Sequence, residues 1–316
     1  MKQLYPDITP FNTFFLETGS VHRVYVEQSG NPAGIPVIFL HGGPCSGTKP
    51  HHRCFFDPER YHIVLMDQRA CGLSQPFGET LSNTTQDLIE DIERIRLALR
   101  VEQWLLFGGS WGATLALLYA QRYPKHVGAM ILRGVFLARA SDMDWFLGHG
   151  AHKIYPQAWS DLLDSVGANS ADGLLARLCE AIFSADDTAV QNATRGWQAW
   201  GAQVALGTDY RGSDINEPLS VPLIQQTRME LNFARHSYFL AENQILAAID
   251  SIQHIPTRII HGQNDLTCPL EAAWRLHKAM PQSYYRVLPR SGHVAHGDEM
   301  VDALVSATDE MAQRLA

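Results

Sequence analysis

The stretch WLLFGGSWGATLALLYAQRYP, residues 104–124, places one serine between an apolar run and a helical pattern. The run 104–107 is continuously apolar, which is typical of a strand buried on both faces of a sheet. Gly108 and Gly112 lie two residues before and two residues after Ser110. Small neighbours permit the sharp bend of a strand that enters a helix directly. In this context G-x-S-x-G predicts a nucleophilic hydroxyl, although a glycine-rich turn with a capping serine has the same pattern.

Further apolar runs predict the rest of the sheet. They alternate with helical patterns, among them a stripe of Leu88, Ile92, Ile95 and Leu99 that Asn83, Thr84 or Thr85 can cap. Strands that alternate with helices predict right-handed crossovers and a mostly parallel sheet flanked by helices, an α/β class fold. The predicted strands are residues 35–40, 62–67, 104–107, 129–134, 257–262 and 284–289, and helices are predicted near 272–280 and from 299 to 316.

The middle of the chain differs in texture. Residues 140–250 contain tryptophans and short helical patches but little that resembles a buried strand. We therefore expect a core domain of residues 1–139 and 251–316, with a helical cap domain inserted at 140–250.

Composition limits the classes of partner. The 316 residues are 46% hydrophobic and 18% charged, which predicts a folded globular protein. A net charge of −8 without a basic stripe argues against nucleic acid, and no run of about 20 apolar residues predicts a membrane helix. Five cysteines do not suggest a disulfide framework, and the first residues do not resemble a signal peptide, so we expect a cytoplasmic protein.

A serine nucleophile requires a histidine base and a carboxylate that orients it. Asp265 follows the run 257–262, and His293 follows the run 284–289. The order Ser110, Asp265, His293 is the one that this architecture uses, and all three would meet at the carboxyl ends of parallel strands. Asp265 could instead belong to a turn. His261, expected to be buried in the sheet, and His296 are alternative bases.

The oxyanion of such a reaction requires preorganised N–H donors. We expect one from Trp111, the residue after the nucleophile, and one from Gly43 in the loop FLHGGPCSG, residues 39–47, although paired glycines also form tight turns. We expect no cofactor and no metal, because His51 and His52 lack a third ligand at suitable spacing.

Taken together, the motifs HGGPCSG, MDQRACGLSQP, the segment around Ser110, IIHGQNDLTCP and SGH resemble those of the proline iminopeptidase (prolyl aminopeptidase) family of α/β-hydrolases. The resemblance covers nearly the whole core. It implies the α/β-hydrolase fold, a helical cap, the triad Ser110, Asp265 and His293, and an oxyanion hole of Gly43 and Trp111. Cys45 and Ala70 stand where the family usually has glycine.

The cap departs further from the family pattern. The resemblance implies cap glutamates for the substrate ammonium, one after a W-x-x-W pair and one three residues before Tyr-Phe. Here Gly201 follows Trp200, and Arg235 lies three residues before Tyr238. These four residues are the predicted substrate-binding positions, and an arginine there would repel a cation. Glu230 or Glu242 could take the place of the missing carboxylates.

Three functions are therefore open. The first is a proline iminopeptidase with rearranged amine-binding carboxylates, which releases amino-terminal proline from short peptides. The second is an esterase or amidase for a substrate without a free amine, with Arg235 paired to a carboxylate or phosphate. The third is a catalytically silent ligand-binding protein. The pattern leaves open whether the chain is a monomer or a homo-oligomer.

Overall fold

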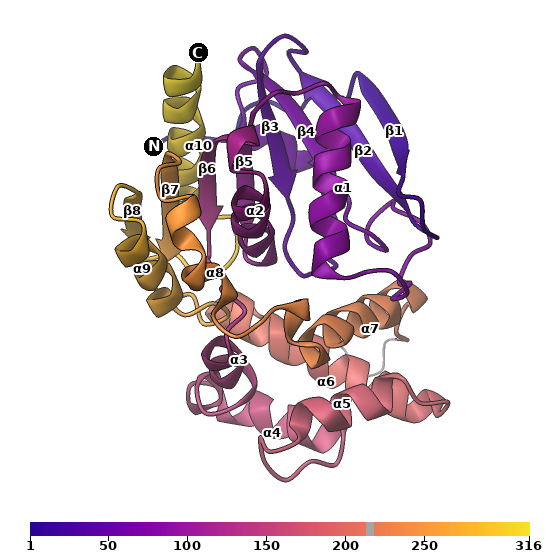
Figure 1. Cartoon of the computed structure of the whole chain (residues 1–316). Helices are drawn as coiled ribbons and strands as arrows, with labels where there is room; N and C mark the ends of the chain where they lie inside the picture. Colours follow the sequence, from indigo (N-terminus) through magenta and orange to yellow (C-terminus); the bar gives the residue numbers. More distant parts are fainter. Residues whose placement is uncertain (213–217) are drawn as a thin grey trace.

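The computed structural model describes residues 1–212 and 218–316. Within these residues one sheet of eight strands has the order β1-β2-β4-β3-β5-β6-β7-β8 (Figure 1). β1 and β2 pair in antiparallel fashion, as do β2 and β4, and the other pairs are parallel. The strands are β1 (Asn12–Glu17), β2 (Arg23–Gly30), β3 (Ile35–Leu40), β4 (Tyr61–Met66), β5 (Trp104–Gly109), β6 (Val127–Arg133), β7 (Thr257–Gly262) and β8 (Tyr284–Leu288).

The six strands that the apolar runs predict are all present, so the predicted fold class is confirmed. The first two strands were not predicted, because β2 carries polar residues at buried positions. Glu27 of β2 is buried and accepts hydrogen bonds from Arg53 at 2.6 and 2.9 Å. A charge that is paired inside the fold breaks the apolar run that indicates a buried strand.

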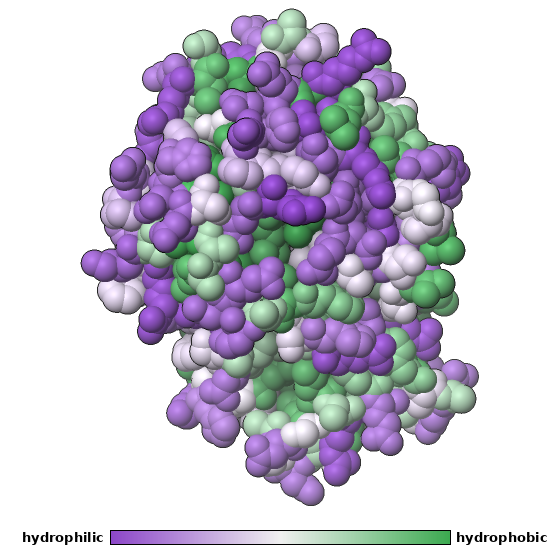
Figure 2. Space-filling view, in the orientation of Figure 1, coloured by the Kyte–Doolittle hydropathy of each residue, from purple (hydrophilic) through white to green (hydrophobic). Residues whose placement is uncertain are grey.

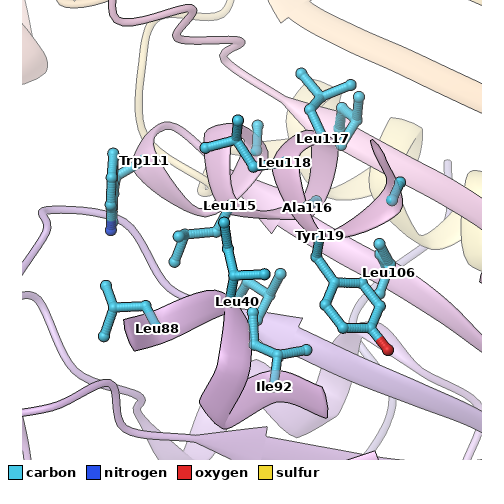
Figure 3. Close-up of a cluster of buried hydrophobic side chains, with 14 of the residues drawn as sticks. Leu40, Leu88, Ile92, Leu106, Trp111, Leu115, Ala116, Leu117, Leu118 and Tyr119 are labelled. Carbon is cyan, nitrogen blue, oxygen red and sulfur yellow. The ribbon is translucent and has the colours of Figure 1, made fainter. Parts of the chain in front are cut away.

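Helices cover both faces of the sheet. Leu40 of β3 and Leu106 of β5 point to one face, where they pack against α1 (Thr85–Ala98) and α2 (Trp111–Arg122) (Figure 3). α9 (Leu270–Ala279) contributes to the same apolar cluster. The alternate strand residues, such as Phe39 and Phe107, pack on the other face with α10 (Asp298–Leu315) and the 3-10 helix η1 (Pro50–Phe55). Both faces are therefore buried, as the continuous apolar runs predict.

The described part of 140–250 contains helices and no strand. These helices gather at the end of the sheet where β5 and β6 point (Figure 1). They have their own apolar cluster, although Met229 and Phe233 of α7 join the cluster of α1 and α2. The division into a core and a cap domain at residues 140 and 250 stays a prediction. The helices are α3 (Ala140–Leu147), α4 (Pro156–Ser165), α5 (Leu174–Ile182), α6 (Asp187–Leu206), α7 (Val221–Arg235) and α8 (Gln244–Ala247).

The viewed surface is mainly hydrophilic, with hydrophobic residues in separate patches, some of them between the cap helices and the sheet domain (Figure 2). Among the described residues, no helix combines the length and the apolar character that a membrane crossing requires.

Candidate active site

Ser110 lies at the turn from β5 into α2 in a strained backbone conformation. Its φ is +57° and its ψ is −123°, a combination that is rare for a residue with a side chain. The flanking glycines allow the turn because a Cβ on Gly108 would overlap the carbonyl of Gly112, and a Cβ on Gly112 would overlap the carbonyl of Leu40. The bend that the sequence predicts is therefore present, and it leaves the Ser110 side chain half-buried at the end of the sheet.

Asp265 and His293 meet beyond the ends of β7 and β8. Nδ1 of His293 lies 2.8 Å from Oδ2 of Asp265. The other carboxylate oxygen accepts the backbone N–H groups of Thr267 and Cys268 at 3.0 and 2.8 Å. Burial is the largest influence on the pKa of Asp265 and raises it. His293, His261 and the Cys268 N–H oppose that effect and together hold this pKa below its ordinary value. The Asp265 carboxylate thus favours its ionised form beside the His293 ring, and its role as the orienting acid stays a prediction.

The two alternative bases lie in unsuitable places. His261 is fully buried, and both of its ring nitrogens have backbone partners. Nδ1 accepts the N–H of Val135 at 3.2 Å, and Nε2 lies 2.8 Å from the carbonyl of Cys268. Burial lowers the pKa of His261, which favours the neutral ring. His296 is exposed on the surface. His293, which lines a cavity together with Ser110, has the better position for a base.

Gln68 bonds to the two segments that carry the predicted oxyanion residues. Its backbone N–H donates to Nε2 of His41 at 3.0 Å, and its side-chain amide donates to the His41 carbonyl at 2.8 Å. Its side-chain oxygen accepts from Nε1 of Trp111 at 2.9 Å. Gly43, two residues after His41, has a φ of +117°, which favours glycine. The Trp111 N–H begins α2, and the first N–H groups of a helix have no partner within it. Gln68 thus holds together the two segments that carry the predicted donors.

The two departures from the family glycines contact each other. Sγ of Cys45 lies 3.6 Å from the carbonyl oxygen of Ala70. Ala70 has a φ of +60°, in the left-handed region where glycine is the usual residue. This contact joins the loop that carries Gly43 to the segment after β4, where Ala70 is held in a strained conformation.

A cavity of about 320 Å³ connects these groups with the cap. Ser110 and His293 line it from the sheet domain, and Trp197, Gly201 and Glu230 line it from α6 and α7. Such a volume is in the range of small-molecule sites. Oγ of Ser110 also lies 3.9 Å from Sγ of Cys268, whose pKa burial raises well above the ordinary value, so this thiol stays protonated.

Comparisons with known proteins show the family of this chain. Residues 35–299 match the family described as alpha/beta hydrolase fold. A protein named proline iminopeptidase from Xylella fastidiosa is 40% identical over 313 residues, which are 98% of this chain and 99% of the relative. A protein of the same name from Arabidopsis thaliana is 40% identical over 98% of this chain and 82% of its own length. A probable proline iminopeptidase from Leptolyngbya boryana is 38% identical over 98% of this chain and 97% of its own.

The chain belongs to the proline iminopeptidase family of α/β-hydrolases. Solved structures support the fold. The proline iminopeptidase-related protein from Thermus thermophilus has a TM-score of 0.59 at 20% identity and covers 96% of each chain. VinJ has a TM-score of 0.64 at 17% identity and covers 98% of this chain and 100% of its own. The chain is accordingly a hydrolase.

The four predicted substrate-binding residues of this family member divide between the cavity and its surroundings. Gly201 and Tyr238 line the cavity. Trp200 of α6 is fully buried in the cap, where Nε1 donates to the Phe146 carbonyl of α3 at 3.1 Å. This bond joins the two helices, and Trp200 itself does not line the cavity. Arg235 is exposed, and its guanidinium donates to Asn232 and stacks over Phe183. Substrate contact stays a prediction for Gly201 and Tyr238, while Arg235 faces away from the lining.

Two carboxylates of the cap line the cavity: Asp142, which pairs with Arg139 at 2.6 Å, and Glu230. Oε2 of Glu230 accepts from Nε1 of Trp197 at 2.6 Å and from Nε2 of Gln198 at 3.1 Å, and Oε1 accepts from Nε2 of Gln226 at 2.9 Å. All three donors are neutral. Among the described residues no ion pair to Glu230 is found, so this half-buried carboxylate faces the cavity without a cation from that part of the chain. The other candidate, Glu242, is exposed and accepts the Ala140 N–H at 2.8 Å.

Burial raises the pKa of Glu230, although its three hydrogen bonds oppose the shift. A carboxyl group whose folded pKa is raised destabilises the folded state as the pH rises through that pKa. We therefore expect Glu230→Gln to raise the melting temperature relative to the unaltered protein by about 2 °C more at about pH 8 than at about pH 5. Thermal melts at both pH values measure this difference. A gain that is equal at both would contradict it.

Two adjacent histidines that the sequence presents, His51 and His52, lie in η1. His52 stacks on Phe39 with ring centroids 4.3 Å apart, and burial lowers its pKa to about 3. In residues 1–212 and 218–316 no group of three or more His, Cys, Asp or Glu side chains is arranged to hold a metal ion. Sequence reasoning did not single out Arg133, which belongs to no quoted motif. It also did not single out Cys268, which lies in the motif of Asp265 but is not itself a nucleophile, base or orienting acid in that pattern.

Proposed function

We propose that this chain is a serine hydrolase that releases amino-terminal proline from short peptides through an acyl-enzyme. One observation supports the specificity above the others: the Glu230 carboxylate, which has no ion pair within the described residues, lines the same cavity as Ser110 and His293. An anion held by neutral donors is suited to a cationic group. The free ammonium of an amino-terminal residue supplies such a cation, and proteins named proline iminopeptidase are 37 to 40% identical to this chain.

The proposed reaction begins at Ser110. His293 accepts the hydroxyl proton as Oγ attacks the carbonyl carbon of the amino-terminal residue. The backbone N–H groups of Gly43 and Trp111 stabilise the resulting oxyanion. The imidazolium, held by the Asp265 carboxylate, then protonates the departing amine, and the carbon–nitrogen bond breaks. Water attacks the acyl-enzyme in the second half of the cycle, with His293 again as the base.

Apolar groups beside Ser110 are suited to a ring such as that of proline. Phe136 and Tyr238 line the cavity and contact each other edge to face, with centroids 4.9 Å apart. Tyr238 also packs on Trp111, with centroids 5.4 Å apart. An apolar side chain bound among these rings is removed from water, which contributes roughly 25 cal/mol per Å² of apolar surface. A carboxylate with no ion pair among the described residues, Glu230, and an aromatic wall therefore favour a small apolar residue with a free amine.

Three substrates test the proposal. The purified protein is offered a prolyl aryl amide, the same amide with an acetylated amine, and a simple acyl aryl ester. We expect cleavage of the first and little or none of the second, because acetylation removes the cation that Glu230 would bind. Turnover of the ester alone would contradict the proposal. It would favour the alternative of an esterase whose substrate has no free amine. That alternative expected Arg235 to bind the substrate.

A further inference from the structure

Arg133, the last residue of β6, connects the segments of Ser110 and His293. Its backbone carbonyl accepts the Ser110 N–H at 2.9 Å. Its guanidinium donates to the backbone carbonyl of His293. β6 lies between β5, which leads to Ser110, and β7, which leads to Asp265 (Figure 1). One residue thus bonds directly to the segments that carry the proposed nucleophile and the proposed base.

The path of this side chain depends on Gly109. Arg133 pairs with Gly109 in the β5–β6 register, and a Cβ on Gly109 would overlap the guanidinium. The glycine beside the nucleophile therefore gives the guanidinium room to lie against β5 while it donates to the His293 segment. This accounts for a small residue at a position that the bend of the chain does not itself require, since G-x-S-x-G leaves it open.

The His293 segment needs such support. Residues 289–297, from β8 to α10, form neither a helix nor a strand. The side chain of His293 is bonded to Asp265, but its backbone lies in a loop whose position is not set by a ladder of sheet hydrogen bonds. The position of the imidazole relative to Ser110 depends on where that backbone is held.

The electrostatic surroundings of Arg133 also indicate that this residue has a role in the proposed active site. Burial lowers the pKa of the guanidinium, and the Asp265 carboxylate opposes the shift. A buried cation costs free energy of desolvation. The arginine recovers part of that cost through its hydrogen bond to His293 and its attraction to Asp265, both within the proposed active site.

We propose that Arg133 is a positioning residue that sets the distance between Ser110 and His293 by holding the backbone of both. This inference rests on the proposed roles of those two residues. It predicts that loss of the guanidinium slows the chemical step and leaves substrate binding nearly unchanged, because Glu230 and Tyr238 belong to other elements.

The test compares Arg133→Met, Arg133→Lys and a matched control, Arg258→Met. Arg258 lies on the neighbouring strand, where it pairs with Glu310 and packs over Tyr284. The kcat on a prolyl aryl amide is measured per active serine, counted by titration with a fluorophosphonate. This normalisation removes any effect of partial unfolding.

We expect Arg133→Met to lower kcat per active serine about tenfold, below the roughly 10²-fold loss that a full displacement of about 1 Å can cause, with KM within about twofold. Arg133→Lys should recover part of the loss, because it retains a cationic donor. Arg258→Met should stay within about twofold of the unaltered protein.

Three results would overturn the inference: an unchanged kcat in Arg133→Met, an equal loss in Arg258→Met, or a lysine variant no better than the methionine variant. A different result would overturn the proposed function itself, namely an unaltered protein that neither reacts with the fluorophosphonate nor cleaves the amide. The two failures are therefore distinguishable.

Discussion

Ser110→Ala is expected to lower kcat on a prolyl aryl amide by about 10⁵-fold or more, to the small residual rate that the oxyanion hole and substrate binding alone can sustain. The substitution removes the atom that forms the acyl-enzyme. A water molecule is a poor substitute nucleophile, because the chain holds the Ser110 hydroxyl in position at the end of β5 whereas a water molecule is not held there. The rate is measured by release of the aryl amine, and covalent labelling by a fluorophosphonate should disappear with it.

The fold of this variant should persist. Ser110 makes no side-chain cap on α2, and alanine has one heavy atom fewer, so the melting temperature should change little. Ser251→Ala is a suitable control, because the Ser251 hydroxyl is exposed and donates only to the Ala248 carbonyl at 2.8 Å. That control should keep full activity. Turnover by Ser110→Ala within about tenfold of the unaltered rate, on any substrate cleaved by the unaltered protein, would remove Ser110 from its proposed role.

Local sequence patterns were sufficient to predict most strands of the sheet and the turn at Ser110. Continuous apolar runs predicted β3 and β7 with their observed bounds, since a strand covered on both faces has no polar side to mask it. Of the three possible caps of α1, Thr84 accepts the Asp87 N–H. The predicted steric reason for the glycines around Ser110 is confirmed, because a Cβ at either position would overlap backbone atoms.

The cap could not be predicted equally well, because a position in a family pattern does not fix the face of a helix. Arg235 and Glu230 are five residues apart on α7, which places them about 140° apart around the helix axis. Glu230 lines the cavity and Arg235 faces outwards. The expectation that Arg235 repels the substrate ammonium assumed that its side chain points in the same direction as the family glutamate that it replaces. The helix geometry favours Glu230 instead.

Arg133 shows a second limit. Its contacts with Ser110 and His293 join residues 23 and 160 positions apart in the chain. A hydrogen bond to a backbone carbonyl has no requirement for a particular residue at the accepting position, so no sequence motif records it. Only the strand order, with β6 between β5 and β7, brings these segments together.

Glu230→Gln is expected to lower kcat/KM on a prolyl aryl amide by about 10²-fold, the equivalent of about 3 kcal/mol, which is in the range for loss of one partner of a buried ion pair. The amide has nearly the same shape but no negative charge, so the ammonium would enter the cavity without compensation for its desolvation. Hydrolysis of an acyl aryl ester without an amine should change by less than about threefold, because the chemistry at Ser110 is untouched.

Glu242→Gln is the matched control for this prediction. Glu242 is also a cap glutamate, but it is exposed and bonds the Ala140 N–H at the start of α3. Its loss should leave both substrates within about twofold of the unaltered rates. An equal decrease on the amide and the ester in Glu230→Gln would indicate general damage to the cavity. Unchanged amide turnover would place the ammonium elsewhere, because a neutral side chain cannot replace a charge that binds the substrate in a water-poor site.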